Sequence, residues 1–311
     1  MAVPTNTMQT YTAVVNREDL SDMVYMISPT ETPFLSGSGR GKAASTLHEW
    51  TTDVLATAAN NAVIEGDDSS AGVVNPGTRV TNRTQISKKV VRLSGTQQAV
   101  NSAGNLYTMG KQMAKASAEL KRDIEFALTQ NTTAVVGAAG TARQTRGLEG
   151  WVATNNSLGS GGAAPNPTSN TAPTDGTQRT LTEAMIKTVL QACWMSGGNP
   201  DTIMLGGVQK QLFSTFNGGG TQFGNLDDKK LISAIDVYVS DFGTLKLVPN
   251  RFQRARTAFV LEMAKWKVAY LRPFTTEDLA KTGDSDAKHL IAEYTLEAAN
   301  EAASGAVRDL S

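Results

Sequence analysis

The segment GSGRGK, at positions 37–42, comes closest to a chemical motif because it has the glycines and the lysine of a phosphate-binding loop. A loop of the Walker type also needs a glycine five positions before Gly41, and a serine or threonine directly after Lys42 to hold magnesium. Ser36 and Ala43 occupy these two positions. The segment is therefore interpreted as a glycine-rich hinge, and no cofactor is expected.

Metal-ligating side chains are few and far apart in the sequence. With two histidines and one cysteine, the chain cannot form a Cys/His zinc cluster. His48 is followed by Glu49, but a zinc protease motif needs a second histidine four positions after the first, and Thr52 stands there. His289 is interpreted as a surface residue at the start of a strand, and Cys193 as a buried, inert thiol in a helix. No metal site is expected.

Adjacent carboxylates include Asp67 with Asp68, Asp227 with Asp228, and Glu277 with Asp278. Neighbouring side chains of an extended segment point to opposite sides, so we interpret these pairs as solvated acids. Weak cation binding at a contact between subunits stays open as an alternative. Because no nucleophile, base or metal constellation stands out, the sequence predicts no catalytic residue, and the protein is not expected to be an enzyme.

Composition also restricts the possible partners. The chain has 311 residues, of which 40% are hydrophobic, enough for one large or two ordinary domains with real cores. It carries 29 basic and 29 acidic residues, whereas proteins that grip nucleic acid normally have a basic excess. Only weak, non-specific contact with DNA is expected. A net charge of zero also removes long-range repulsion between copies, which permits self-association.

Cellular context is indicated by what the sequence lacks. A single cysteine suits a reducing cytoplasm. The N-terminus has no basic segment followed by an apolar stretch, and no run of about 18 apolar residues occurs anywhere. We therefore expect neither secretion nor a membrane partner.

The elements that position these residues begin with a polar segment, residues 1–44, that is interrupted by prolines and glycines. Apart from a short helix expected at 19–27, it has too few apolar residues for a core of its own. It is predicted to be an arm that is ordered where it lies on a neighbouring subunit. Phe34 and Leu35, after two prolines, are expected to be an extended apolar anchor for that contact.

Residues 45–95 are predicted to form a long β-hairpin, because 45–55 and 79–93 are rich in Thr, Val and Ile. The tip between them is acidic and has turn residues, whereas the returning strand is basic. The hairpin is either a solvated surface feature or a projecting arm whose charges meet a neighbouring subunit. The charged residues assigned to that contact are Glu65, Asp67, Asp68, Arg79, Arg83, Lys88 and Lys89.

Apolar residues at intervals of three or four predict a helix over residues 98–130, roughly 45–50 Å long. The stretch 155–178 consists almost entirely of small, polar and proline residues and is predicted to be a flexible loop. A second unit begins near residue 179. Its expected helices are 181–195 and 208–216, and its expected strands are 202–205, 234–240, 244–249, 258–263, 266–271 and 290–296. Without a regular βαβ repetition, the class is α+β.

Two segments at opposite ends of the chain are similar to those of a phage major head protein family. They are REDLSDMVYMISPTETPFLS at 17–36 and LRPFTTEDLAKTGDSDAKHLIAEYTLEAANEAASGAV at 271–307. The order of the predicted parts, over nearly the whole chain, resembles the tailed-phage major capsid protein of the Hong Kong 97-type (Johnson) fold. That resemblance implies an N-terminal arm at 1–44, an extended hairpin loop at 45–95 and a spine helix with the peripheral domain at 96–179. It further implies an axial domain at 180–270 and a C-terminal return to the peripheral domain at 271–311.

The function implied by the resemblance is a major capsid protein. Such a protein self-assembles through hexamers and pentamers into the icosahedral head shell around the double-stranded DNA of a tailed phage. It is found in the virion capsid, and in the host cytoplasm during assembly. Portal, scaffolding and decoration proteins are the further partners implied. Three alternatives stay open, namely an encapsulin-like nanocompartment shell, a tail tube or sheath protein, and an enzyme with an unrecognised site.

Overall fold

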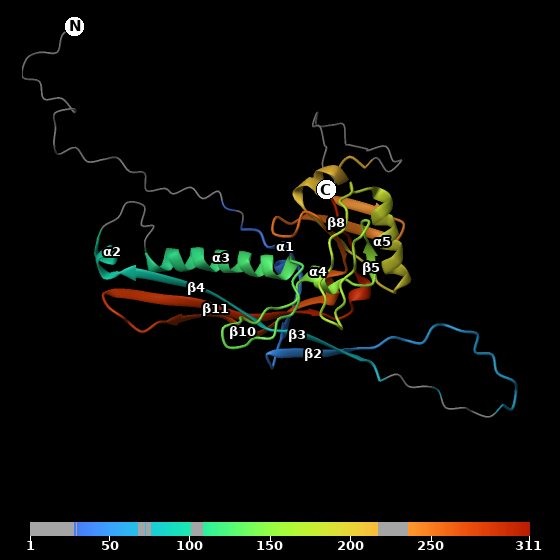
Figure 1. The fold of residues 1–311 in the computed structure, drawn as a ribbon, viewed down its shortest axis with the longest axis horizontal. Coiled ribbons are helices and arrows are strands. Elements are labelled where there is room, and N and C mark those ends of the chain that lie inside the picture. The colour runs from blue at the N-terminus through green and yellow to red at the C-terminus, as the bar shows by residue number, and fades with distance from the viewer. Residues whose placement is uncertain (1–27, 29, 68–71, 73–75, 101–107, 217–235) are drawn as a thin grey trace, which may run out of the picture.

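The computed structural model describes residues 28, 30–67, 72, 76–100, 108–216 and 236–311, which form two packed units and a long projecting loop (Figure 1). A long helix and a four-stranded sheet make the first unit, and a six-stranded sheet with two helices makes the second. This mixture agrees with the predicted α+β class. The short helix expected at 19–27 lies outside the described residues.

The sheet of the first unit has the strand order β1 (Gly39–Lys42), β10 (Trp266–Asp278), β11 (Ser285–Ala298) and β4 (Gln85–Ser94). β1 runs parallel to β10, and the other neighbours are antiparallel. The strands expected at 266–271 and 290–296 are the apolar parts of β10 and β11. Both strands are longer than predicted, because their remaining residues are held by pairing and not by burial of alternate side chains.

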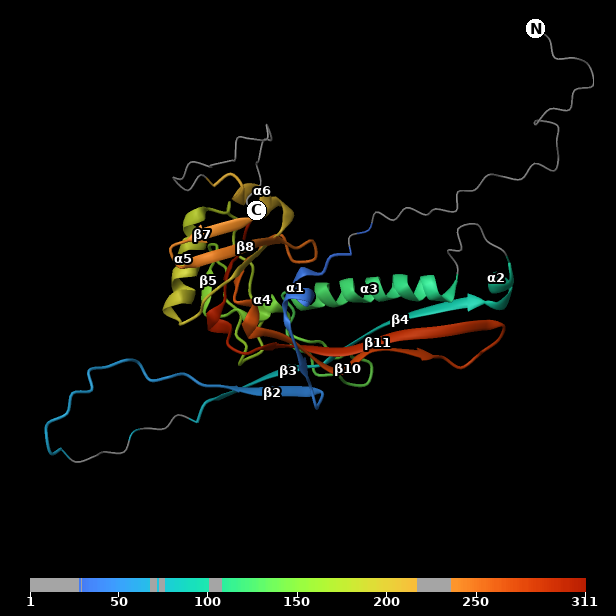
Figure 2. The same cartoon turned by 180° about the vertical axis from the view of Figure 1, so that it is seen from behind.

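Helix α3 (Met109–Thr129) covers one face of this sheet (Figures 1 and 2). Leu120, Ile124 and Leu128 recur every four residues, so they lie on one side of the helix, and none of them is exposed. They pack in one core with alternate residues of β11, which are Leu290, Ala292, Tyr294, Leu296 and Ala298. The amphipathic pattern therefore positions the helix against the sheet.

The helix is shorter than the 98–130 span that its periodicity predicts. A separate short helix, α2 (Gly95–Ala99), precedes it, and Ser94 caps α2 by accepting a hydrogen bond from the backbone of Gln97. Residues 101–107 lie outside the described part of the chain. With 21 residues, α3 is about 30 Å long.

The second unit has the strand order β5 (Asn155–Ser157), β12 (Gly305–Val307), β9 (Ala258–Leu261), β6 (Thr202–Leu205), β8 (Gly243–Pro249) and β7 (Val237–Ser240). Helices α5 (Glu183–Met195) and α6 (Gly207–Phe213) contact it. The core joins Ile186, Val189 and Leu190 of α5 with Ile203 and Val260 of the sheet. Most helices and strands predicted for this unit are present, with ends shifted by a few residues.

The C-terminal segment crosses between the units. The predicted boundary at 270/271 falls inside β10, and the final residues join the six-stranded sheet through β12, whereas a return to the first unit was expected for all of 271–311. Arg308 follows β12 and is almost fully buried. Its guanidinium lies 3.2 Å from the carboxylate of Glu149, in helix α4 (Leu148–Trp151). This ion pair holds the C-terminal segment against α4, where the two sheets meet.

The polar stretch 155–178 is ordered, and the prediction of a flexible loop there is wrong. The carboxylate of Asp309 accepts hydrogen bonds from the backbones of Gly159 (2.9 Å) and Gly176 (2.7 Å), and it lies 3.5 Å from Arg256. A side chain at Gly159 would collide with Asp309 and with the backbone of Thr177. Low apolar content therefore reflects close backbone packing here, and not mobility.

The predicted long hairpin is only partly present. β2 (Leu47–Thr52) pairs with β3 (Thr78–Arg83), but the chain then leaves this ribbon, and β4 pairs with β11. Buried Thr84 lies at the change of sheet and donates a hydrogen bond to Glu293 of β11. Composition identified both strands, but it could not show which strand each of them pairs with.

Among the described residues, no helix has the length and apolar character needed to cross a bilayer.

Replacing Asp309 with alanine is expected to lower the free energy of unfolding by about 2–4 kcal/mol, because two backbone donors lose a charged acceptor. It is also expected to speed proteolysis within 159–176. Asp309→Asn is the matched control, since asparagine tolerates the left-handed backbone at this position (φ 60°) and retains one acceptor oxygen. Equal stability of wild type and Asp309→Ala in urea titrations would contradict the anchoring role.

Candidate intersubunit contact site

The described part of the loop between β2 and β3, residues 53–67, projects away from both units (Figures 1 and 2). Its aliphatic side chains are open to solvent: Leu55 is 99% exposed, and the exposure of Val54, Val63 and Ile64 ranges from 73% to 82%. Apolar residues gathered on a projecting loop, with no core beneath them, are typical of a contact surface.

The acidic tip of this loop is partly described. Gly66 has a positive φ of 86°, and the backbone N–H of Asp67 donates a hydrogen bond to the carbonyl of Ile64 over 3.1 Å. This turn lies in the exposed end of the loop and carries Glu65 and Asp67. The third predicted acid, Asp68, lies outside the described residues.

The root of the loop is fixed to the first unit. The indole N–H of Trp50, on β2, donates to the carbonyl of Ala298 over 2.8 Å. His48 lies 3.0 Å from the carboxylate of Glu297. On β3, the buried amide of Asn82 donates to the carbonyl of Leu296 over 2.7 Å. These contacts hold the ribbon rigidly against the end of β11, so its direction is set by the subunit itself.

The four basic residues assigned to one strand are divided between two sheets. Arg79 lies on β3 and is paired with Glu49 over 3.8 Å, and Arg83 ends the same strand, half-buried. Lys88 and Lys89 lie on β4 and point to opposite faces. Lys89 faces α3, where it forms an ion pair of 2.7 Å with Asp123, whereas Lys88 is exposed. A single basic stem therefore does not exist.

The expectation that Phe34 is an extended anchor for a neighbour is wrong. Phe34 and Leu35 lie in the short helix α1 (Pro33–Gly37), and Phe34 is completely buried in the core of its own subunit. Its ring meets that of Trp266 edge-on, with centroids 6.3 Å apart. Leu35 is half-buried against the same core. The apolar pair was recognised correctly, but the surface that it covers belongs to the same chain.

Sequence patterns do not distinguish Glu125, a residue at which three segments meet, from the surface acids of the same helix. It is completely buried in α3. One carboxylate oxygen accepts hydrogen bonds from the backbone of Phe34 (2.8 Å) and from the amide of Asn250 (2.6 Å), which follows β8. The other accepts from the backbone of Leu35 over 2.7 Å. A single carboxylate thus joins the first helix, the long helix and the second unit.

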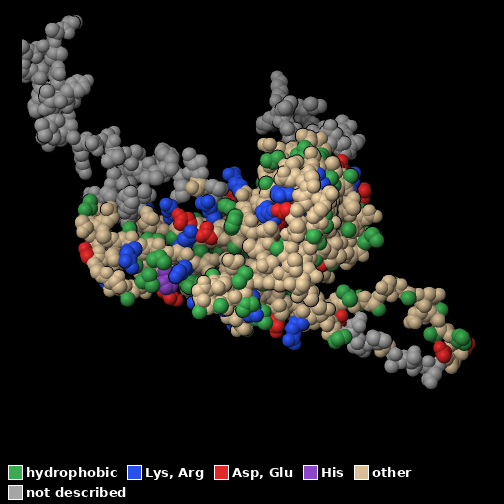
Figure 3. All heavy atoms as spheres, in the orientation of Figure 1, with side chains coloured by type: hydrophobic (Ala, Val, Ile, Leu, Met, Phe, Trp, Pro, Cys, Tyr) green, Lys and Arg blue, Asp and Glu red, His purple; other side chains and the backbone are tan. Residues whose placement is uncertain are grey.

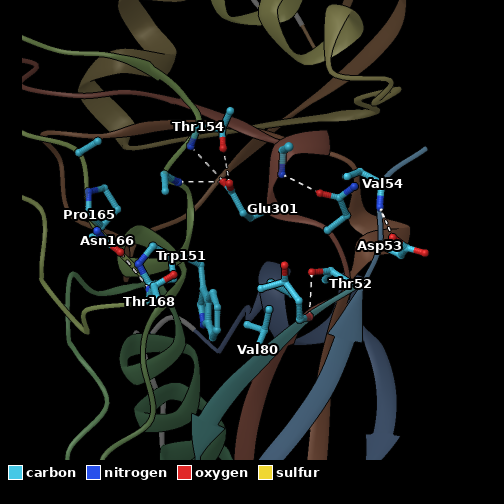
Figure 4. Close-up of a pocket in the computed structure, with 17 residues that line it drawn as sticks. Thr52, Asp53, Val54, Val80, Trp151, Thr154, Pro165, Asn166, Thr168 and Glu301 are labelled. Atoms are coloured by element: carbon cyan, nitrogen blue, oxygen red, sulfur yellow. Dashed lines mark hydrogen bonds between the residues drawn. The ribbon is translucent and has the colours of Figure 1, made fainter. Parts of the chain in front are cut away.

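A groove of about 650 Å³ lies at the base of the projecting loop (Figure 4). It is lined by Thr52 at the end of β2, by Val54 of the loop, by the indole of Trp151 and by the proline-rich segment near Pro165. The carboxylate of Glu301, at its edge, accepts hydrogen bonds from the backbone and hydroxyl of Thr154. This carboxylate is therefore used within the chain and is not presented as a catalytic acid.

Within the described ranges, the remaining candidate reactive groups have no catalytic arrangement. Cys193 is buried as predicted, and burial raises the pKa of its thiol to about 12, so it holds its proton at neutral pH. The part of the chain that the structure describes contains no group of three or more His, Cys, Asp or Glu side chains suited to a metal ion.

Three solved structures with this arrangement come from phages, and two of them are described as capsid structures. The chain aligns with the "Cyanophage A-1(L) capsid asymmetric unit" at a TM-score of 0.68 and 16% identity, covering 97% of this chain and 99% of the other. A structure from Gordonia phage Cozz aligns at a TM-score of 0.64 and 11% identity, covering 99% of this chain and 97% of the other. A chain of the "Phage G gp27 major capsid proteins and gp26 decoration proteins" structure aligns at a TM-score of 0.54 and 9% identity, over the full length of both chains. The fold is therefore the capsid fold predicted from the resemblance.

The family model described as SU10 major capsid protein matches residues 3–311, and the chain belongs to that family. It is also 27% identical to the major capsid protein of Escherichia phage Phieco32, over 92% of each chain. The protein is thus a structural component of the phage head shell and not an enzyme. The predicted function is confirmed, and the compartment, tail-tube and enzyme alternatives are set aside.

Replacing Glu125 with alanine is expected to lower the free energy of unfolding by roughly 3–5 kcal/mol, because three N–H donors lose their acceptor. Glu125→Gln retains the shape and one acceptor oxygen, so it should cost less. Urea unfolding of the unassembled chain measures both values. A loss below about 1 kcal/mol for Glu125→Ala would contradict this role, because it would mean that water replaces the carboxylate as the hydrogen-bond acceptor.

The same carboxylate gives a pH dependence with a defined sign. Burial raises the pKa of Glu125 above its ordinary 4.5, and the three hydrogen bonds only partly oppose this effect. Between pH 4.5 and the raised value, the folded state keeps a proton that the unfolded state has lost. The contribution of Glu125 to stability therefore falls as pH rises through this window. Wild type should lose stability relative to Glu125→Gln over that range, and a constant difference would contradict the shift.

Proposed function

We propose that this capsid protein forms its shell through hexamers and pentamers in which the projecting loop of each subunit lies on a neighbour. The observation that carries this proposal is the loop itself, whose aliphatic side chains are 73–99% exposed at Val54, Leu55, Val63 and Ile64. Its rigid root supports a role as a fixed connector, because a loop held in one direction loses less entropy on binding.

In this proposal the first unit is the peripheral domain, α3 is the spine helix and the second unit is the axial domain. The long helix with its four-stranded sheet, and the separate six-stranded sheet, support that assignment. Residues 1–44 serve as the arm, although Phe34 tethers its end to the subunit's own core.

The packaged double-stranded DNA is proposed to touch the shell only weakly. The equal numbers of acidic and basic residues support this view, because tight binding to phosphates requires a basic excess. Portal, scaffolding and decoration proteins are proposed as further partners. A decoration protein accompanies the major capsid protein in the phage G structure.

Full-length chain, expressed alone and analysed by size-exclusion chromatography and electron microscopy, is expected to form closed particles or capsomer-sized rings. Reversing Glu65, Asp67 and Asp68 to lysine should reduce particle yield far more than it changes the unfolding curve of the single chain. The exposed loop contributes little to the subunit's own core, so folding should be spared. An unchanged particle yield would contradict a role for the acidic tip, and a strictly monomeric wild type would contradict autonomous assembly.

A further inference from the structure

One face of the sheet in the first unit is left uncovered along strand β4. This strand lies at the edge of the sheet, and α3 covers only the face to which Lys89 points. The opposite face carries Ile86, Lys88, Val90 and Arg92, all of which are exposed. Ile86 and Val90 are 45% and 51% accessible. Two aliphatic and two basic side chains therefore alternate along one exposed row.

The basic groups of this row are available for a partner. Among the described residues, no ion pair includes Lys88 or Arg92, whereas nearby carboxylates are already engaged. Glu293 lies 2.6 Å from Arg143, and Glu277 lies 3.2 Å from His289. Basic and hydrophobic side chains lie intermixed over this end of the sheet in Figure 3, together with a histidine and an acidic side chain beside it. A segment with both aliphatic and acidic side chains would complement this row in hydrophobicity and charge.

We propose that the β4 row, Ile86, Lys88, Val90 and Arg92, receives residues 63–67 of a second copy of this chain. That segment has the complementary composition, with two aliphatic side chains, Val63 and Ile64, followed by Glu65 and Asp67. The inference rests on the proposed function, in which the loop contacts a neighbour, and it adds the surface that receives the loop.

The spacing of the charges is compatible with such a contact. Lys88 and Arg92 stand about 13 Å apart along the strand. Glu65 and Asp67 lie in the turn closed by the Asp67–Ile64 hydrogen bond, so they stand closer together than the roughly 7 Å of an extended segment. The long stems of lysine and arginine span this difference while their apolar parts cover Ile86 and Val90. The aliphatic pairs supply buried area, and the charges set the register.

The loop cannot reach the β4 row of its own subunit. It projects from one end of the first unit, whereas β4 runs toward α2 at the other end, and both views agree on this separation (Figures 1 and 2). Donor and acceptor surfaces at opposite ends make a head-to-tail contact. Such a contact generates closed rings when its rotation closes, as a capsomer requires.

Disulfide trapping tests the contact directly. Ile64→Cys and Val90→Cys are placed in separate full-length chains and co-assembled, and an oxidant is then added. A disulfide-linked dimer is expected from the mixture and from neither variant alone, because the two thiols come from different copies. Buried Cys193 does not compete. Particles that form from the mixture but give no linked dimer would overturn the proposal.

Charge reversal separates this proposal from the proposed function. Lys88→Glu with Arg92→Glu should reduce particle yield by about tenfold or more, and adding Glu65→Lys and Asp67→Lys should restore it. Lys121→Glu with Lys246→Glu is the matched control, because both lysines are exposed and neither lies on β4, and it should leave the yield unchanged. If reversing the tip blocks assembly but reversing the β4 row does not, the loop contact stands and this receiving surface is wrong. If neither matters, both proposals fail.

Discussion

The subunit depends on one buried carboxylate, that of Glu125. It accepts hydrogen bonds from the first helix on one side and from Asn250 of the second unit on the other, and it does so from near the C-terminal end of α3. A buried charge without a cation is costly unless its lone pairs are satisfied, and here backbone and amide donors satisfy them. This arrangement fixes α1, the long helix and the two sheets in one relative orientation. The ion pair of Arg308 with Glu149 reinforces the same joint from the C-terminus.

Because the subunit is rigid, the direction of its projecting loop is defined relative to the rest of the molecule. Trp50 and Asn82 hold β2 and β3 against the end of β11, so the direction in which the loop starts is set by the subunit. The exposed aliphatic residues of the loop and the uncovered row of β4 then lie at opposite ends of one body. A shell protein of this kind needs no catalytic centre, because its function resides in the angle and the chemistry of a repeated contact.

Much of this could be predicted from the sequence. Periodicity located α3 and α5, and the similarity of the two chain ends indicated the capsid fold. The sequence could not predict which strands pair or which surface an apolar residue covers. β4 pairs with β11 and is not part of the predicted hairpin, and Phe34 is buried in the core of its own subunit. These outcomes depend on contacts between residues far apart in the chain, which local patterns do not encode. Stretch 155–178 was misjudged because its glycines serve close packing against Asp309, which no periodicity reveals. Glu125 was hidden for the same reason, since it resembles the surface acids around it until its partners are known.

An electron cryomicroscopy reconstruction of particles assembled from the full chain is the most direct test of a shell built by head-to-tail contacts between rigid subunits. The account predicts that the two units keep their relative orientation in every copy, with Glu125 at the joint, and that residues 63–67 of each subunit lie on the β4 row of the next. Loops that fold back onto their own subunits, or copies whose two units are rotated freely against each other, would contradict it.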